Sequence, residues 1–268
     1  MIKEYHIATS IAEAVSLKKS QADKTAWFAG GTYINHLKFR DNFQSVISLE
    51  KLSLDQIEKD QTTVSIGAMV TFQKLMDFPG TPDALKEAAA LKRSRIIRNM
   101  ATIGGDIGSG ETHTLLCPVL IALSAQVETA ESGTMLLEAY IAQKSQDLIT
   151  RIMLVSEKPM ITKIRTISAQ YDSPLVTSVA VGVNKNSGGN IDSIIIAVGS
   201  VEKQIRRLNT IEESIKTGQL KDADSIANAV SEQIEPFEDI LGSVEYKKYI
   251  TGIAVSDCVM ECLEGENE

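Results

Sequence analysis

The first part of the chain alternates helical periodicity with short apolar runs. The runs at 25–28 and 46–49 have the length and composition of buried strands. A capping-box pattern begins at Ser10, so we expect a helix that starts there and continues through Lys18. Together these elements predict a small α/β unit over residues 1–56.

The middle of the chain, residues 57–165, mixes short strands with helices. Its apolar runs are brief, and its alanine-rich stretch is typical of a helix. We expect strands at 64–66 and 152–155, and helices that begin at Thr71 or lie at 84–91 and 115–125.

The last part, residues 166–268, begins with long apolar strands and ends with helices. The strands expected at 175–183 and 191–198 are separated by a stretch rich in Asn and Gly, which predicts a turn. Helix N-caps are expected at Asp222 or Asp224, and again at Ser243. The apolar stripe expected on the final helix consists of Tyr246, Ile250, Ile253 and Met260.

Charge and composition exclude several functions. The net charge of −8 opposes binding to nucleic acid, which relies on an excess of Lys and Arg. The sequence contains neither a secretion signal at its start nor an apolar run of about eighteen residues, so we expect a cytoplasmic protein that does not contact a membrane. Cys117, Cys258 and Cys262 have neither a disulfide pattern nor a zinc-site spacing, and we expect no metal on this chain.

Two glycine-rich segments carry the candidate chemistry. The first glycine segment is AGGT at 29–32, and the second is ATIGGDIGSG at 101–110, which holds four glycines in ten residues. Glycine allows close backbone approach and positive φ, and successive N–H groups in such loops form a nest for phosphate oxygens. Neither segment has the spacing of a P-loop or of a G-x-G-x-x-G fingerprint. We therefore expect both segments to surround one extended ligand, which is large and flat or anionic.

The second glycine segment and its surroundings resemble a known family. IRNMATIGGDIGSG, followed after four residues by LLCPVLIALSAQVE, resembles the IRN-x-x-TIGGN segment and next helix of the FAD-binding subunit of molybdenum hydroxylases, the family of xanthine dehydrogenase and carbon monoxide dehydrogenase. FAGGTYINHLKFR, VISLEKLSLDQIE and VSIGAMVTFQKLM resemble its earlier motifs in the same order. IIIAVGSVEKQIRRLNTIEESIKTG and ILGSVEYKKYI resemble its later ones. The resemblance covers nearly the whole chain.

This resemblance implies a fold. It is an α+β arrangement with a two-subdomain FAD-binding region, followed by a C-terminal domain of β-sheet and helices. The small α/β unit over 1–56 would be the first FAD-binding subdomain, and a mainly antiparallel sheet unit over 57–165 the second. Residues 166–268 would form the C-terminal domain of the family.

The resemblance also implies a function in electron transfer. In the family, electrons leave the substrate at a molybdopterin centre on a large subunit and pass two 2Fe-2S clusters on an iron–sulfur subunit. They then reach FAD on the medium subunit, which passes them to NAD or another acceptor. We therefore expect this chain to be an FAD-dependent oxidoreductase subunit whose partner chains carry the iron–sulfur clusters and molybdopterin. Because the cofactor performs the chemistry, no catalytic side chain is expected.

Particular residues are implied to hold FAD. Gly30, Gly31 and Thr32 would donate hydrogen bonds to the pyrophosphate, while the second glycine segment would let its backbone approach the same group. Lys163 would approach the isoalloxazine ring. The expected FAD-binding residues are Ala29, Gly30, Gly31, Thr32, Tyr33, Ile34, Thr102, Ile103, Gly104, Gly105, Asp106, Ser109 and Lys163.

Several positions depart from the family pattern, among them the stretch 167–169, where the family carries an arginine pair. Tyr33 stands where relatives carry a polar or acidic residue, Asp106 replaces an asparagine, and Leu115 replaces an aspartate. A carboxylate at position 106 accepts but does not donate hydrogen bonds, and it repels a nearby pyrophosphate. Two alternatives therefore stay open: a structural or assembly subunit of the same fold that has lost FAD, and a stand-alone flavin oxidoreductase.

Overall fold

The computed structural model describes residues 2–21, 24–155, 160–170 and 173–265. The chain forms two compact units, of which the first consists of Met1–Gly110 and Ala125–Val155 and the second of Glu111–Ser124 and Ser156–Glu268. The segment 111–124 therefore belongs to the second unit, although the chain on both of its sides belongs to the first. A further boundary at residue 56, inside the first unit, stays a prediction.

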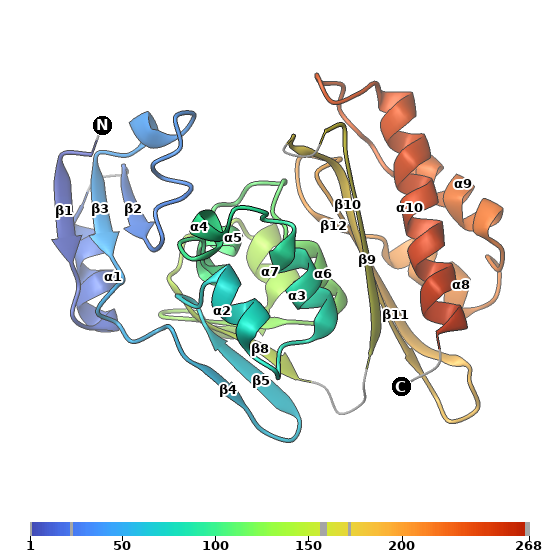
Figure 1. Ribbon diagram of the computed structural model, residues 1–268, viewed down its shortest axis with the longest axis horizontal. Coiled ribbons are helices and arrows are strands. Elements are labelled where there is room, and N and C mark those ends of the chain that lie inside the picture. The colour runs from blue at the N-terminus through green and yellow to red at the C-terminus, as the bar shows by residue number, and fades with distance from the viewer. Residues whose placement is uncertain (1, 22–23, 156–159, 171–172, 266–268) are drawn as a thin grey trace. The chain divides into compact units, whose positions relative to one another are not determined.

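A small parallel sheet opens the first unit (Figure 1). Strand β3 (Ser45–Ser48) lies between β1 (Glu4–Ile7) and β2 (Thr25–Phe28) and pairs in parallel with both. Helix α1 (Ile11–Ser20) follows β1, and the short 3-10 helix η1 (Arg40–Asn42) precedes β3. All four residues of β3 are buried, as expected for a central strand.

Helix α1 begins at the predicted cap. The Ser10 hydroxyl accepts a hydrogen bond from the N–H of Glu13 at 3.1 Å. The Glu13 carboxylate in turn accepts one from the N–H of Thr9 at 2.8 Å. These two bonds satisfy donors that the helix itself leaves unpaired. The predicted helix and the strands expected around it are confirmed.

In the described residues, the rest of the first unit is an antiparallel sheet with five helices. Its strands, in spatial order, are β4 (Ile57–Lys59), β5 (Thr63–Gly67), β8 (Ile149–Val155), β6 (Gln126–Thr129) and β7 (Gly133–Leu136). Its helices are α2 (Phe72–Asp77), α3 (Asp83–Ala90), α4 (Arg95–Arg98), α5 (Ile103–Gly108) and α7 (Leu137–Ala142). Val64 and Ile66 alternate with less buried residues on β5, which is the period expected for a strand with one buried face.

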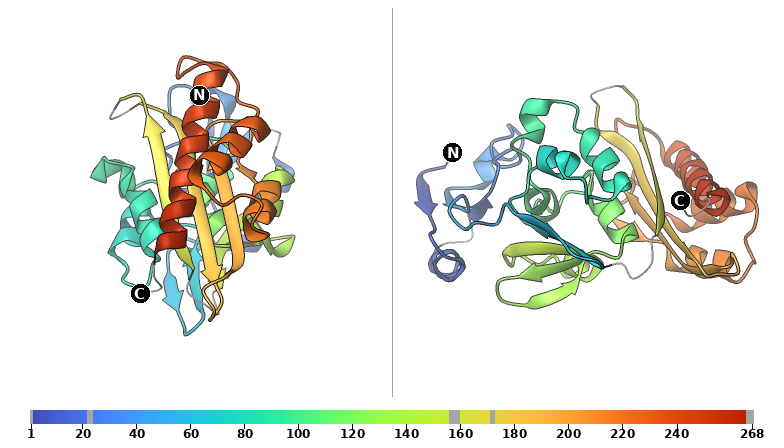
Figure 2. Two further views of the ribbon diagram at one scale, coloured as in Figure 1. Left: turned by 90° about the vertical axis from the view of Figure 1, so that its right-hand side faces the viewer. Right: turned by 60° about the horizontal axis from the view of Figure 1, so that its bottom comes forward.

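The second unit is built on a longer antiparallel sheet. Its strands, in spatial order, are β12 (Arg206–Arg207), β11 (Ile191–Gly199), β10 (Leu175–Lys185) and β9 (Ile161–Ser168). Its helices are α6 (Cys117–Ala122), α8 (Asn209–Lys216), α9 (Ala223–Gln233) and α10 (Val244–Glu264). Figure 2 shows α10 running along one face of this sheet.

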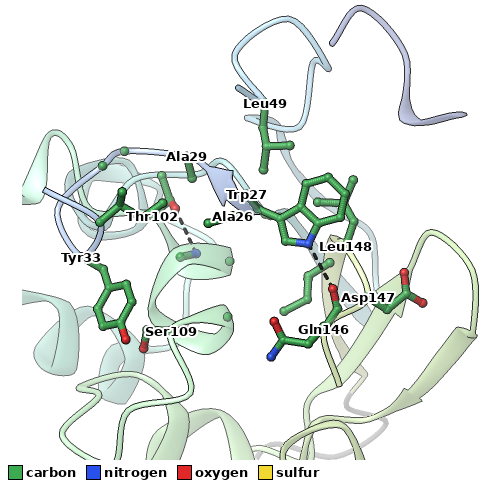
Figure 3. A pocket seen from close by; sticks show the side chains of 18 of the residues that line it. Ala26, Trp27, Ala29, Tyr33, Leu49, Thr102, Ser109, Gln146, Asp147 and Leu148 are labelled. Carbon is green, nitrogen blue, oxygen red and sulfur yellow. Dashed lines mark hydrogen bonds between the residues drawn. The ribbon is translucent and has the colours of Figure 1, made fainter. Parts of the chain in front are cut away.

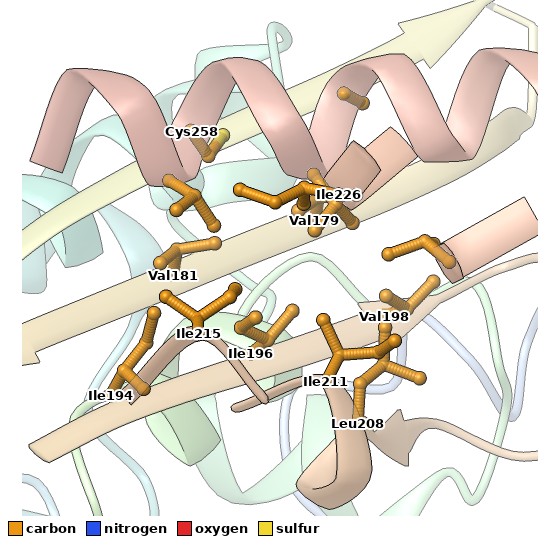
Figure 4. Packing of buried hydrophobic residues seen from close by; sticks show 14 of the residues in the cluster. Val179, Val181, Ile194, Ile196, Val198, Leu208, Ile211, Ile215, Ile226 and Cys258 are labelled. Atoms are coloured by element: carbon orange, nitrogen blue, oxygen red, sulfur yellow. The ribbon is translucent and has the colours of Figure 1, made fainter. Parts of the chain in front are cut away.

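Strand β10 is buried on both faces, which explains its continuous apolar run. Val179 and Val181 point into the cluster that α8, α9 and α10 complete (Figure 4). The intervening Gly182 faces α6, because a Cβ placed there would lie 2.5 Å from the carbonyl oxygen of Ala122. Helices therefore cover both sides of the sheet.

One expectation about the last helix is wrong. Ser243 does cap α10, since its hydroxyl accepts a hydrogen bond from the N–H of Tyr246 at 3.2 Å. The expected stripe, however, is not the buried face, and Tyr246 is 44% exposed. Small residues face inward because α10 packs closely on α9: a Cβ at Gly252 would lie 2.5 Å from the Ala227 carbonyl oxygen. The fully buried positions are Lys247, Thr251, Ala254, Val255, Cys258, Val259 and Cys262.

The three sheets and their helices form the α+β fold that was expected. A small parallel α/β part and an antiparallel sheet make up the first unit, and a sheet covered by helices makes up the second. No helix in the described ranges is long and apolar enough to cross a membrane.

Candidate functional site

The first unit contains a cavity of about 330 Å³ at the carboxyl end of β2 (Figure 3). Three stretches of chain line most of it: β2 with the turn that follows, helix α5, and the segment 145–149 that leads into β8. Ligands of α/β folds commonly bind at the carboxyl ends of parallel strands, where loops leave a crevice. The volume lies within the range of small-molecule sites, roughly 300–1,000 Å³.

The first glycine segment forms the turn after β2. A Cβ at Gly30 would lie 1.6 Å from the carbonyl oxygen of Met100, so only glycine allows the two backbones to pack this closely. Gly31 has a φ of 70°, which glycine adopts without strain. These glycines therefore bring the first glycine segment onto the residue that precedes the second.

This turn also offers backbone donors to the cavity. The N–H groups of Gly30, Gly31 and Thr32 make no hydrogen bond to any other residue that the structure describes. Half-buried N–H groups in folded proteins are normally paired, and successive unpaired ones bind anions. The turn therefore fits the oxygens of a phosphate or pyrophosphate group.

The second glycine segment is a helix, and the expectation of a phosphate nest there is wrong. Thr102 caps α5, because its hydroxyl accepts a hydrogen bond from the N–H of Gly105 at 3.1 Å. The N–H of Gly104 donates to the carbonyl oxygen of Ala68 at 2.9 Å. A glycine-rich stretch forms a helix here because this cap and this packing outweigh the low helix propensity of glycine.

Helix α5 nevertheless supplies a bare wall to the cavity. A Cβ at Gly104 would lie 2.7 Å from the Ala68 carbonyl oxygen, so this glycine is required for packing within the protein. Gly108 differs, because a Cβ placed there would meet no described atom within 4 Å outside the adjacent backbone of its own helix. Gly108 therefore leaves open space on the cavity side of the helix.

The third wall, the segment 145–149, was not anticipated from the sequence. It is joined to the first wall by Trp27 on β2, whose indole Nε1–H donates to the backbone oxygen of Gln146 at 3.1 Å. Leu148 and Leu49 lie beside the indole (Figure 3). Trp27 had a detectable signal, since it stands three residues before Gly30 on a predicted strand. The segment 145–149 had none, because a contact distant in sequence places it.

Two charged side chains, those of Asp147 and Lys18, line the cavity, and they have different partners. The Asp147 carboxylate accepts hydrogen bonds from the N–H groups of Glu131 at 3.1 Å and Ser132 at 2.8 Å. Burial acts to raise the pKa of this carboxyl, but hydrogen bonds from Thr129, Ser132 and Glu131 outweigh it and hold the pKa below its usual range. The Lys18 ammonium donates to the Thr25 carbonyl oxygen and lies 5.7 Å from the centre of the Trp27 ring.

Tyr140 closes the cavity near Asp147. Its hydroxyl donates to the Asp147 carbonyl oxygen at 3.0 Å. Burial, with the charge of Asp147, raises the pKa of Tyr140 to about 12, so the phenol stays neutral at physiological pH. The other polar groups in the wall are hydroxyls and amides, which suit an uncharged sugar or ribityl chain.

Most of the residues predicted from the sequence meet at this cavity. Those that line it are Ala29, Gly30, Gly31, Thr32, Tyr33, Ile34, Thr102, Gly104, Gly105 and Ser109. Ile103 is fully buried and Asp106 is on α5, and neither lines the cavity. Lys163 lies exposed on β9 of the second unit. The contacts of all these residues with a cofactor stay predictions.

Comparison with known proteins decides the family. Residues 1–165 match the family model described as "FAD binding domain in molybdopterin dehydrogenase". The chain belongs to this family. The match identifies an FAD-binding domain of the molybdopterin dehydrogenases, and the relatives of this chain include the medium chain of a carbon monoxide dehydrogenase.

Individual relatives match over most or all of the length of this chain. "Uncharacterized protein YgfM" of Escherichia coli strain K12 is 33% identical over 268 residues, which are 100% of this chain and 99% of that protein. The carbon monoxide dehydrogenase medium chain of Hydrogenophaga pseudoflava is 27% identical over 270 residues, 93% of each chain. In the solved structure of carbon monoxide dehydrogenase from Hydrogenophaga pseudoflava, a chain superposes with a TM-score of 0.87 at 24% identity, covering 97% of this chain and 96% of that one.

Proposed function

We propose that this chain binds FAD in the cavity of the first unit and relays electrons within a molybdenum hydroxylase. The electrons would arrive from iron–sulfur clusters on a partner chain and leave to NAD or another acceptor. One observation carries the proposal: both glycine segments meet at one cavity, where the first offers three backbone N–H groups that no described residue pairs. The turn with unpaired N–H groups thus lies in the part of the chain that matches the FAD-binding family, and it suits the pyrophosphate of FAD.

Different residues of the cavity bind different parts of the cofactor. The turn at Gly30–Thr32 binds the pyrophosphate through its N–H groups. The hydroxyls of Thr102 and Ser109 lie at the α5 wall, where they contact the hydroxyl-rich part of the ligand. Bound FAD supplies the redox chemistry, while the protein supplies position and electrostatics. Ile103, Asp106 and Lys163 are retained as proposed contacts from the family pattern.

The departures from the family pattern are compatible with a working site. Tyr33 lines the cavity, and its ring stacks on Phe39 with the centroids 4.2 Å apart, so this larger residue has a fixed place. Asp106 and Leu115 do not line the cavity. The carboxylate of Asp106 is thus outside the wall that offers donors to the pyrophosphate, which favours a flavoprotein over a subunit that has lost FAD.

Cofactor identity provides the test. The purified chain, or the chain reconstituted with excess FAD, should show flavin absorption, and the ligand released by denaturation should have the mass of FAD. FMN alone would remove the argument for a pyrophosphate site. Absence of any flavin after reconstitution would favour the structural subunit, and turnover of a small substrate by the isolated chain would favour a stand-alone oxidoreductase.

A further inference from the structure

The cavity has two chemically different ends (Figure 3). One end carries the hydroxyls of Tyr33, Thr102 and Ser109, and the Tyr33 ring points toward Ser109. The other end is formed by Trp27 together with Leu49 and Leu148. The phosphate-binding turn connects these ends in the chain, since it follows the strand that carries Trp27 and precedes Tyr33.

The Trp27 end is a fixed aromatic surface. The hydrogen bond from the indole to the Gln146 oxygen, 3.1 Å long, fixes the orientation of the ring. The indole also packs against the buried cluster that contains Leu49 and Leu148, so only part of it remains open to the cavity. A rigid, partly exposed aromatic side chain is suited to a flat heteroaromatic base, which gains stacking or edge contacts.

A positive charge accompanies this aromatic surface. The Lys18 side chain lines the cavity, and its ammonium lies 5.7 Å from the centre of the Trp27 ring. Among the described lining residues, this is the one ammonium or guanidinium group. A base joined to phosphate therefore finds aromatic and cationic partners at the same end, whereas the hydroxyl-lined end suits a polyhydroxyl chain.

We propose that Trp27 and Lys18 form the subsite for the adenosine diphosphate half of FAD. This rests on the proposed function, because it divides the same cavity between the two halves of one ligand. Adenine binds at the aromatic end and the ribityl chain at the hydroxyl-lined end. Lys18 and the N–H groups of the turn donate hydrogen bonds to the phosphates between them. The subsite consequently binds free ADP without any flavin.

The chain offers a direct readout, because Trp27 is its one tryptophan. Apo-protein is titrated with ADP, adenosine, FMN and riboflavin. The fluorescence of Trp27 is excited, and its emission is recorded at each ligand concentration. ADP should change the emission saturably. Bound flavin quenches tryptophan by energy transfer from either end of the cavity, so the flavin end is located by competition, and saturating riboflavin should not weaken ADP binding. Displacement of ADP by riboflavin would place the flavin at this end and overturn the assignment.

Two pairs of variants extend the test. Trp27→Leu should weaken ADP binding, measured by calorimetry, by about tenfold, the size expected for losing one base–aromatic contact, and Trp27→Phe should keep most of it. Lys18→Gln should weaken ADP by about tenfold while adenosine binding stays the same, as for a lost charge-assisted hydrogen bond. Lys19→Gln is the matched control, since Lys19 pairs with Glu131 and does not line the cavity.

FAD binding, measured separately by flavin fluorescence, distinguishes the two proposals. Binding of FAD without any ADP response would overturn the subsite and leave the proposed function standing. Failure to bind either ligand would overturn both. If Trp27→Leu lowers the melting temperature too far for a titration, the competition between ADP and riboflavin in the unchanged protein still decides.

Discussion

The glycines around the cavity have separate physical roles. At Gly30 and Gly104 an added Cβ would collide with backbone oxygens, of Met100 and Ala68 respectively. These positions are required for packing, so substitution there damages the fold before it affects a ligand. Gly108 lines the cavity without such a neighbour. It is therefore the position where ligand space can be changed without disturbing the protein.

Gly108→Leu should abolish or strongly weaken FAD binding and leave the fold intact. The new side chain extends into the cavity, and leucine is also favoured over glycine in a helix, by about 0.5–1 kcal/mol. FAD titration and thermal melting of both proteins would measure the effect. Gly30→Ala is the opposite control, expected to lower the melting temperature because its Cβ meets Met100. Full FAD affinity in Gly108→Leu would show that the ligand lies elsewhere.

At the scale of single elements, helix α5 depends on its cap. Thr102 supplies the oxygen that pairs the N–H of Gly105, and four of the ten residues at 101–110 are glycines with weak helix propensity. Thr102 also lines the cavity. The Thr102 side chain therefore both caps α5 and contributes to the wall of the cavity.

Thr102→Ala should cost about 1 kcal/mol of unfolding free energy, the usual loss for an N-cap, and should weaken FAD binding as well. Thr102→Ser retains the hydroxyl and should restore both properties. Urea denaturation and FAD titration of the three proteins provide the measurements. Equal stability of the alanine variant would show that packing on Ala68 alone maintains α5.

The segment 145–149 depends on the charge of Asp147. Its pKa lies below the ordinary 3.8, so the ionised form stabilises the folded state above that pH, and this contribution disappears as the pH falls through the lowered pKa. Asp147→Asn should therefore lower the unfolding free energy at pH 7 by about 1 kcal/mol. At a pH well below 3.8 the difference between the two proteins should shrink.

Urea denaturation at both pH values tests this prediction. Asp77→Asn, at an exposed carboxylate on α2, is the control and should show little effect at either pH. A difference between Asp147→Asn and the unchanged protein that is the same at pH 7 and at a pH well below 3.8 would contradict a role for the charge.

Elements with local signals could be predicted from the sequence. Ser10, Thr71, Asp222 and Ser243 all cap helices, as their positions relative to apolar residues indicated. Helix 115–125 was expected too long: α6 ends at Ala122, and Ser124 takes a positive φ of 54°. Such a conformation depends on tertiary packing, which propensity does not describe.

The candidate site could also be predicted only in part. The glycine segments marked two walls, because their spacing and family resemblance are properties of continuous sequence. The wall at 145–149 and the position of Lys18 depend on pairing of distant strands and on one helix packed against a sheet. The helix α5 was missed for the same reason, since bonds to Ala68 and Thr102 hold this glycine-rich stretch in a helix where a loop was expected.

At the scale of the whole molecule, the basic surface at residues 92–98 contrasts with an acidic chain. Lys92 and Arg95 are exposed next to Ile96, which is 73% exposed, while the net charge is −8. Arg98 holds this segment in place, since its guanidinium donates to the carbonyl oxygens of Lys92 at 3.0 Å and Arg93 at 2.7 Å. We expect this surface to meet an acidic region of the iron–sulfur partner.

Arg95→Glu should reduce assembly with an iron–sulfur chain and a molybdopterin chain that are co-expressed with it. Reversing an exposed charge slows oriented docking and adds repulsion, without removing the contacts of Arg98. Size-exclusion chromatography at low and high salt would measure the complex. Lys216→Glu, exposed on α8, is the matched control. Unchanged assembly of Arg95→Glu would exclude this surface as the docking site.

Backbone hydrogen exchange with and without FAD tests the central claim most directly. The account predicts that the amides of Gly30, Gly31 and Thr32, unpaired among the described residues, exchange fast in the apo-protein and slow when FAD binds. Amides of α5, already paired, should change less. Strong FAD binding that leaves exchange at 29–33 unchanged would contradict the proposal that this turn holds the pyrophosphate.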